Sequence, residues 1–594
     1  MTLNRLPQRR SQVHAHRHAM PAATRPSRDS THDSTHDTTH DTTRRESLAW
    51  LLVISVVALL EGWLTRAQLN PDGVSYFDLA DALRRGEWAS FVQGYWSPLY
   101  PVLLVPFRVV AAASGADTLA AAHFANSFIA IVGALLTHRL IAGVWTSLPN
   151  RTWAPRALWI RAVWATYATC MLVLTRIDSI TPDGLLLCVM IASVTELLMH
   201  GGTRGMRLGA MFGLAFLAKT SVWPWLLFTL VAIAAPWSLP AKRGALVRTS
   251  LSAILVMLAW VIPMSATYGH LTLGSTGALN HCWYLRKCDS RSPDTHTGAH
   301  RAYENVTLDA TRTITVASFG DAAWTYSPWG DPTSWVEGVL TKHEEAWTVG
   351  GYVSLVLRNL WEEVRFVGRF LYLPIVLVVL LCLGRGKKRF TRNVGTDRAV
   401  TATLLGAMGL AQFVAVHVEP RLLAPFAFVH VVALVAFAIR AGTPPTSALA
   451  NERTKEKRKG RSIETPRGSW ADAVLASVPM LIVLPVLAYG VYGDALAGTS
   501  VAIYRAEIAS ITAQASRGFA RRTIVVVGDA FPLIAHAKAL GARVVAQVLP
   551  ASADLLASLP PAERQRVLRE AGKGQADVAW QMREDGRVQI TPLN

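Results

Sequence analysis

The chain has 594 residues, of which 51% are hydrophobic and only 17% are charged, and its mean hydropathy is +0.28. A soluble protein of this size carries about a quarter charged residues, so the composition excludes an ordinary soluble globular protein. The formal net charge is +19. Most of this excess lies in short loops between apolar runs, where Lys and Arg fix membrane orientation, and no basic–aromatic module predicts nucleic-acid binding.

The first 46 residues are polar and contain the repeat "DSTHDSTHDTTHDTT". This repeat has no apolar face that could offset the entropy of ordering, so residues 1–46 are predicted to be a disordered tail on the cytoplasmic side. A polar segment of this length before the first apolar run also argues against a cleavable signal peptide.

Apolar runs of about 17–25 residues, long enough to cross a bilayer, then recur along the chain. They predict eleven crossings, near 47–65, 119–141, 157–175, 181–199, 206–219, 221–237, 249–268, 364–384, 399–417, 422–440 and 471–493. With the N-terminus inside, the basic loops all fall inside, including a charged linker at about 441–470. The outer loops are then about 67–118 and 269–357. We therefore expect an α-helical polytopic protein of the cell (inner) membrane, with its transmembrane domain at 47–493.

The first outer loop begins with "NPDGVSYFDLADALRRGEW", residues 70–88. Apolar residues recur at every third position from Val74 to Leu83, which predicts a short helix lying on the membrane surface and ending at Gly86. The following "PLYP" is predicted to lie at the interface as well. Asp72 at the start of this helix has two interpretations: an N-cap, or part of a site.

Three further polar clusters project to the same membrane face. They are "TRIDSITPDGLLL" with Asp178 and Asp183, "FLAKTSVWPW" with Lys219, and "HVEPRLLAPF" with Glu419 and Arg421. Each cluster alone fits an interfacial anchor or a helix cap. Acids and bases gathered on one face of a membrane bundle favour a polar cavity, and together with Asp72 they define a candidate site.

The region 494–594 changes character. "TIVVVGD" and "ARVVAQVL" predict buried strands, "FPLIAHAKAL" and "ADLLASLPPAERQRVLREAG" predict helices, and "VAWQMREDGRVQI" predicts a hairpin. The prediction is a small α/β domain outside the cytoplasm. It lacks a GxGxxG motif, so dinucleotide binding is not expected.

Two of the five cysteines, Cys282 and Cys288, lie in the polar outer-loop segment "HCWYLRKC". An oxidising compartment favours a disulfide between them, with two separate thiols as the alternative. The remaining three fall in apolar runs and are predicted to be core residues: Cys170, Cys188 and Cys382.

The order of these motifs, from "PDGVSYFDLADALRRGEW" and "SPLYP" through "TPDGLLL" and "LAFLAKT" to "EPRLLAPF", resembles the GT-C glycosyltransferases that use polyprenyl-phosphate sugars. Protein mannosyltransferases (glycosyltransferase family 39) and lipid A aminoarabinose transferases are the characterised examples. The resemblance covers roughly 47–440, and an outer C-terminal domain is a feature of the aminoarabinose branch. It implies a GT-C fold with interfacial helices in the first outer loop.

The resemblance also implies residue roles. Asp72 matches the aspartate that acts as general base or orients the acceptor, although Gly73 stands where many members have Glu. Because of that departure, the chain lacks two adjacent carboxylates here, and one style of metal binding depends on such a pair. The family's second acidic position matches Asp183, with Asp178 as the alternative, and Lys219 matches a residue near the lipid phosphate.

The chemistry supports these roles independently. A departing phosphate builds negative charge, which Lys219 or Arg421 would stabilise in a dry site, and the attacking hydroxyl needs a carboxylate base. Glu419, Asp178 and Tyr100 complete the residues expected at the donor side. The sequence assigns no cofactor with certainty and leaves the use of a divalent cation open.

The expected function is transfer of a sugar from a polyprenyl-phosphate carrier, held in the bilayer, to a lipid, glycan or protein acceptor outside the cytoplasm. The alternatives are a transporter or flippase of lipid-linked sugars, or a polymerase or ligase of such sugars. Transporters place charged groups within broken helices near the membrane midplane. Here the charged groups lie at helix ends, which favours the enzyme.

Overall fold

The computed structural model forms two units, Met1–Thr42 and Thr43–Asn594, and the second contains the helix bundle and the β-sheet. The residues that the structure describes are 34–66, 68, 70–114, 118–146, 153–200, 204–234, 243–277, 280, 284, 302–309, 311–318, 348–366, 398–441, 522–527, 543–548, 550–582 and 588–593.

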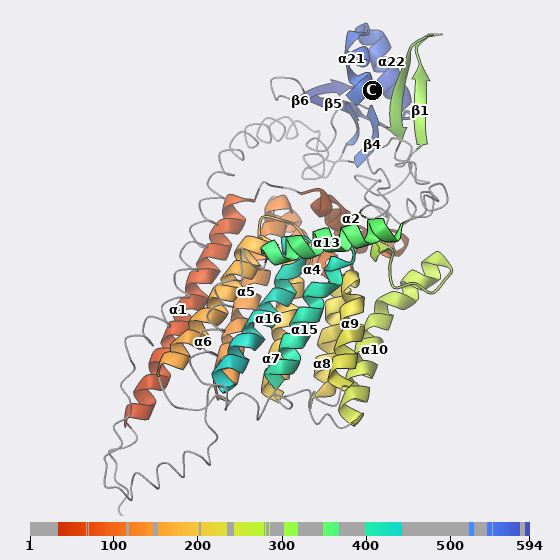
Figure 1. Cartoon of the computed structure of the whole chain (residues 1–594). Coiled ribbons are helices and arrows are strands. Elements are labelled where there is room, and N and C mark those ends of the chain that lie inside the picture. The colour runs from red at the N-terminus through yellow and green to blue at the C-terminus, as the bar shows by residue number, and fades with distance from the viewer. Residues whose placement is uncertain are drawn as a thin grey trace, which may run out of the picture. The chain divides into compact units, whose positions relative to one another are not determined.

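A bundle of apolar helices makes up most of the described chain (Figure 1). Its long members are α1 (Ser34–Leu64), α5 (Thr118–Thr146), α6 (Trp153–Ala168) with its π-helical extension η1 (Thr169–Thr175), α7 (Asp183–His200), α10 (Arg243–Tyr268) and α16 (Pro420–Ala441). Shorter helices are α4 (Leu99–Ser114), α8 (Gly205–Ala218), α9 (Trp223–Ala234) and α15 (Arg398–Val414).

Six segments of the described residues are long and apolar enough to cross a membrane: Arg44–Leu64, Leu119–Val144, Ala157–Thr175, Asp183–His200, Gly244–Tyr268 and Pro420–Ile439. They coincide with six of the predicted crossings. Three more predicted crossings, 206–219, 221–237 and 399–417, correspond to the shorter helices α8, α9 and α15. The crossing at 471–493 lies outside the described residues, as does 364–384 beyond Phe366.

Two predicted segments differ from the structure. Helix α1 begins at Ser34, so residues 34–46 are helical and not disordered, because extending an existing helix is easier than nucleating one. The predicted interfacial segment "PLYP" opens a 16-residue apolar helix, α4, that continues through Pro106.

Close contact between α8 and α10 depends on small residues. Gly205, Gly209 and Gly213 recur every fourth position of α8 and face α10. A Cβ atom at Gly209 would lie 2.1 Å from the carbonyl oxygen of Thr249, which leaves no room for any side chain. Such small-residue stripes allow apolar helices to approach closely enough to gain dispersion contacts.

Helix α13 (Val349–Phe366) begins in the predicted outer loop, which was expected to end near 357, and continues to the start of the predicted crossing at 364–384. It runs crosswise at one end of the bundle (Figure 1). The Asn359 side chain donates a hydrogen bond to the carbonyl of Val414, the last residue of α15 (3.0 Å). Val353, Leu357 and Trp361 expose a second apolar side. An amphipathic helix fastened to the end of an apolar one is typical of a membrane interface.

Hydrogen bonds join the loops at the end of the bundle that holds the candidate site. They link Ile180 N to Asn70 Oδ1 (2.8 Å), Thr220 N to Ser97 Oγ (2.8 Å), Ser275 N to Gly94 O (2.7 Å) and Thr276 Oγ1 to Tyr95 O (3.0 Å). Four segments far apart in sequence are thereby held against one another.

The described residues also form a six-stranded sheet, with strand order β1-β2-β4-β3-β5-β6. Its C-terminal strands are β3 (Thr523–Val527), β4 (Arg543–Val548), β5 (Val578–Met582) and β6 (Val588–Pro592), with helices α21 (Pro550–Ser558) and α22 (Pro561–Ala571). The strands β3 and β4 and the hairpin β5–β6 lie where the sequence predicted them.

The other two strands come from the outer loop. β1 (Ala302–Thr307) and β2 (Thr313–Ser318) form an antiparallel hairpin, and β2 pairs with β4 through Val316 and Val548. Without β2, the backbone groups of β4 on that side would be an unpaired edge. The α/β unit predicted at 494–594 is therefore completed by a hairpin from more than 200 residues earlier.

Candidate active site

A cavity of about 420 Å³ lies where these joined loops meet. Its polar lining includes Asp72, Asp183, Lys219, Glu419 and Arg421, five of the seven residues predicted for the site. They come from α2 (Pro71–Arg85), α7, the α8–α9 connection and the start of α16. Tertiary packing has thus brought four separate sequence motifs into one space.

Asp72 reaches this cavity because α2 begins just before it. Asn70 is the N-cap and Pro71 occupies the first helical position, so Asp72 is not the cap. Its Oδ2 accepts a hydrogen bond from Nη1 of Arg421 (2.9 Å), and its side chain is 28% exposed. The capping interpretation of Asp72 is therefore wrong. The helix stops at Gly86 as predicted, with φ 76°.

Asp183 is the first residue of α7 and is completely buried. Its Oδ1 accepts a hydrogen bond from Nζ of Lys219. Its Oδ2 has no hydrogen bond within the part of the chain that the structure describes and lies 4.0 Å from Nη1 of Arg421. Lys219 ends α8 in an extended conformation, which turns its side chain away from the helix. A buried carboxylate is stable only when paired, and this pair explains why both charges tolerate their surroundings.

Arg421 is the centre of the charge network. Besides Asp72 and Asp183, its Nε lies 2.7 Å from Oε1 of Glu419, an ion pair without hydrogen-bond geometry. The cluster contains three carboxylates and two cations, so it carries one excess negative charge if all are ionised.

Aromatic side chains form another part of the wall. Tyr76 and Tyr95 both pack edge-on against Trp96, with ring centroids 5.1 and 4.6 Å from it. Burial, with Asp72 and Asp183 nearby, raises the pKa of Tyr76 well above its ordinary value. Burial and Asp72 likewise raise the pKa of Tyr95. Both phenols therefore stay protonated and able to donate hydrogen bonds.

Sequence reasoning missed one pair at the cavity. The rings of Tyr284 and His417 are stacked with centroids 4.0 Å apart and an interplanar angle of 2°. Burial lowers the pKa of His417, which favours the neutral imidazole. Tyr284 belongs to "HCWYLRKC" and His417 to "HVEPR", but neither segment indicates the other as a partner. The predicted Cys282–Cys288 bridge lies outside the described residues, and Cys170 and Cys188 are buried as expected.

Asp178 and Tyr100 do not line the cavity. Asp178 is held by Arg176 through two hydrogen bonds (3.0 and 2.5 Å). The buried hydroxyl of Tyr100 donates to Oδ1 of Asn126 (2.7 Å). Each polar group is satisfied by a neighbour outside the cavity, so the structure does not bring these two residues to the predicted site.

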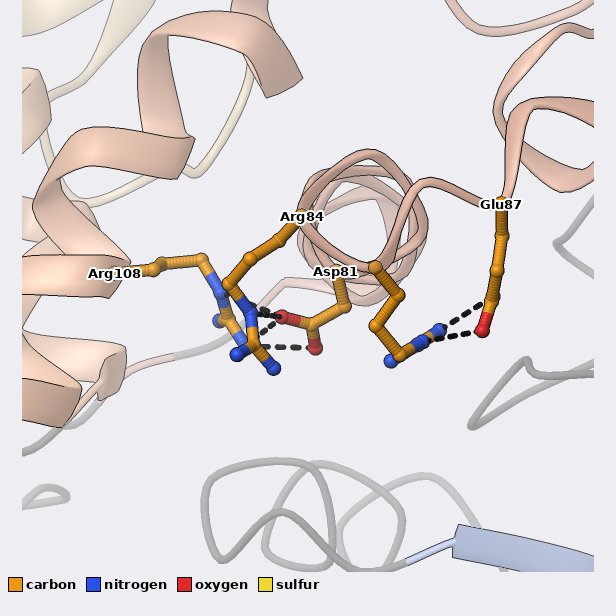
Figure 2. Close-up of polar contacts among 5 residues, drawn as sticks. Asp81, Arg84, Glu87 and Arg108 are labelled. Atoms are coloured by element: carbon orange, nitrogen blue, oxygen red, sulfur yellow. Dashed lines mark hydrogen bonds and ion pairs between the residues drawn. The ribbon is translucent and has the colours of Figure 1, made fainter.

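Asp81, farther along α2, has a structural partner. Figure 2 shows its carboxylate against Arg108 of α4, with Nη2 2.8 Å from both oxygens, and with Arg84 close by. Asp81 does not line the cavity. This ion pair fastens α2 to α4, and the Arg85–Glu87 pair beside it lies at the end of α2 (Figure 2).

Within the described residues, no group of three His, Cys, Asp or Glu side chains is arranged to hold a metal ion. At the cavity the carboxylates of Asp72, Asp183 and Glu419 instead contact Lys219 or Arg421.

No protein-family model and no curated protein matches this sequence. Among solved structures, the chain is similar to the crystal structure of ArnT from Cupriavidus metallidurans bound to undecaprenyl phosphate, with 14% identity and a TM-score of 0.45 over 92% of this chain and 98% of that one. Its apo form gives 12% identity and a TM-score of 0.41 over the same shares. At these values the function has to be argued from the chain's own residues.

Proposed function

We propose that this chain is a membrane glycosyltransferase that moves a sugar from a polyprenyl-phosphate carrier to an acceptor outside the cytoplasm. The observation that carries the proposal is the cavity, in which a carboxylate open to substrate and a lysine lie together at the end of an apolar helix bundle. A lipid-linked donor fits this arrangement because its chain stays in the bilayer while its head group enters the polar cavity.

Asp72 acts as the base. Its Oδ2 is held by Arg421, and its Oδ1 has no hydrogen bond among the described residues, so Oδ1 is available to an acceptor hydroxyl. The hydroxyl oxygen attacks the anomeric carbon, and its proton passes to Asp72. The bond between that carbon and the phosphate oxygen breaks, and the polyprenyl phosphate leaves with the electron pair.

Lys219 binds the donor phosphate. Its side chain is 19% exposed although its Nζ also contacts Asp183. An ammonium group has three donors, so it can bind both the carboxylate and a phosphate oxygen. Asp183 has no exposed surface with which to reach substrate, so its part is to hold Lys219 and Arg421 in position. The charge that develops on the leaving phosphate is then met by a fixed cation.

A transporter of lipid-linked sugars would place charged groups within the membrane helices. Glu196 is such a group, buried in α7, and its Oε1 has no hydrogen bond to any of the described residues. It lies more than three helical turns beyond Asp183 and does not line the cavity. A polymerase or ligase would use the same chemistry on a different acceptor.

The decisive experiment incubates the purified protein in lipid with a panel of radiolabelled polyprenyl-phosphate sugars and an extract of envelope acceptors. Transfer of label by the unmodified chain, abolished in Asp72→Asn, is the expected result. Transfer of intact carrier-linked sugar across sealed vesicles, without cleavage of the phosphate bond, would overturn the proposal in favour of transport. Orientation is tested separately, by labelling cysteines introduced on each side of intact cells, with the N-terminus expected inside.

A further inference from the structure

Glu419 lies at the cavity but does not suit the donor side, where the sequence had placed it. It is the residue immediately before α16, its side chain is 36% exposed, and its Oε1 lies 2.7 Å from Nε of Arg421. A carboxylate repels a phosphate, so a direct contact between Glu419 and the donor head group would be unfavourable.

Arg421 connects Glu419 to Asp72. One guanidinium group uses Nη1 to bind Asp72 (2.9 Å) and Nε to contact Glu419 (2.7 Å). In general, a cation beside a carboxylate favours the ionised form and makes the carboxylate a weaker proton acceptor. A second carboxylate on the same guanidinium offsets part of that charge and limits how the arginine can turn.

We infer that Glu419 is a positioning residue for the proposed base, acting on Asp72 through Arg421. It fixes the guanidinium against Asp72 and offsets part of the positive charge that Asp72 faces. The inference rests on the proposed function, since it assigns Glu419 to the acceptor step of that reaction and not to donor binding.

Other ionisable groups also surround this pair. From α7, Asp183 lies 4.0 Å from Arg421, and Lys219 is bound to Asp183. Four more ionisable side chains face the network: Tyr76, Tyr95, Tyr284 and His417. Burial raises the pKa of each tyrosine and lowers the pKa of His417, so all four are neutral near pH 7. Removal of one negative charge therefore acts mainly on the balance between Arg421 and Asp72.

The test measures kcat against pH, and KM for the donor, for Glu419→Gln and Glu419→Asp in the full chain. In Glu419→Gln we expect the plateau of kcat to fall roughly tenfold, because a less basic carboxylate is a poorer proton acceptor. The acid limb of the profile should move to lower pH, because a neighbouring negative charge is gone. The donor KM should stay the same or fall. Glu419→Asp should restore the position of the acid limb.

The matched control is Glu362→Gln on α13, which removes the same charge at an exposed position paired with Arg365 and outside the cavity. Its profile should superimpose on that of the unmodified chain. A lower kcat in Glu419→Gln with an unmoved acid limb would mean a merely structural role, and a strongly raised donor KM would return Glu419 to the donor side. Absence of transfer in the unmodified chain with every donor would instead contradict the proposed function itself.

Discussion

Two aspartates on α2, Asp72 and Asp81, have different surroundings, and this separates catalysis from stability. Asp72 lines the cavity and is bound there by Arg421, whereas Asp81 is held by Arg108 and does not line the cavity. Asp72→Asn should lower the transfer rate about 10²–10⁴-fold, the range for loss of a general base, with little change in Tm.

Asp81→Asn serves as its control. It should keep most of the activity but lower the free energy of unfolding by about 1–3 kcal/mol, because the charged hydrogen bonds to Arg108 are weakened. Transfer assays and thermal melts of both variants in the same lipid check this. Equal activity in Asp72→Asn and the unmodified chain would contradict the catalytic role.

Lys219 can be tested against its second role as the partner of Asp183. Lys219→Ala should weaken donor binding roughly 10- to 100-fold, the effect of losing one hydrogen bond to a charged group, while Lys219→Arg should lose less. Because Lys219→Ala also leaves Asp183 buried without its cation, the double variant with Asp183→Asn removes both charges. Donor affinity that recovers in the double variant would show that Lys219 only neutralises Asp183. Titration of each variant with a short-chain prenyl phosphate measures this donor affinity.

At the scale of elements, the α8–α10 contact sets where Lys219 stands, since Lys219 ends α8. Gly209→Ala places a methyl group 2.1 Å from the Thr249 carbonyl oxygen, so α8 has to shift. We expect a loss of about 1–3 kcal/mol of stability and weaker donor binding. Gly244→Ala on α10 is the control, because its methyl group would meet no atom of the described residues within 4 Å. Thermal melts and donor titrations compare the two variants. Equal stability and equal donor affinity in both would mean that α8 can shift without disturbing Lys219.

Helix α2 also shows why some predictions from the sequence were confirmed and others were not. Helix α2 was predicted from residues 70–88 alone, because its apolar spacing and Gly86 are local signals. Asp178 was predicted at the site because its polar cluster projects to the same membrane face, and Tyr100 was expected at the donor side, but neither lines the cavity. Their partners, Arg176 and Asn126, decide which way each side chain points, and apolar spacing carries no information on that.

At the scale of the whole molecule, the outer loop and the C-terminal region share one sheet. Val316 of β2 is buried and pairs with Val548 of β4. Val316→Asp should release the hairpin, because an unpaired carboxylate costs several kcal/mol when buried. Thr313→Asp, at an exposed position of the same strand, is the control. Limited proteolysis should then cut within 302–318 in the first variant only, and protection in both would mean that the strand pairing is not needed to hold the loop.

The sequence by itself determined the membrane class, most of the helix positions and the five charged residues of the cavity. These follow from hydropathy, periodicity and charge, which act within one segment at a time. Only the tertiary structure decided that Arg421 joins Asp72, Asp183 and Glu419, that Tyr284 stacks on His417, and that an outer-loop hairpin completes the C-terminal sheet. Each of these contacts joins residues far apart in sequence or depends on how helix ends pack. The shape and burial of the folded chain decide which residues meet, and no local sequence pattern encodes that.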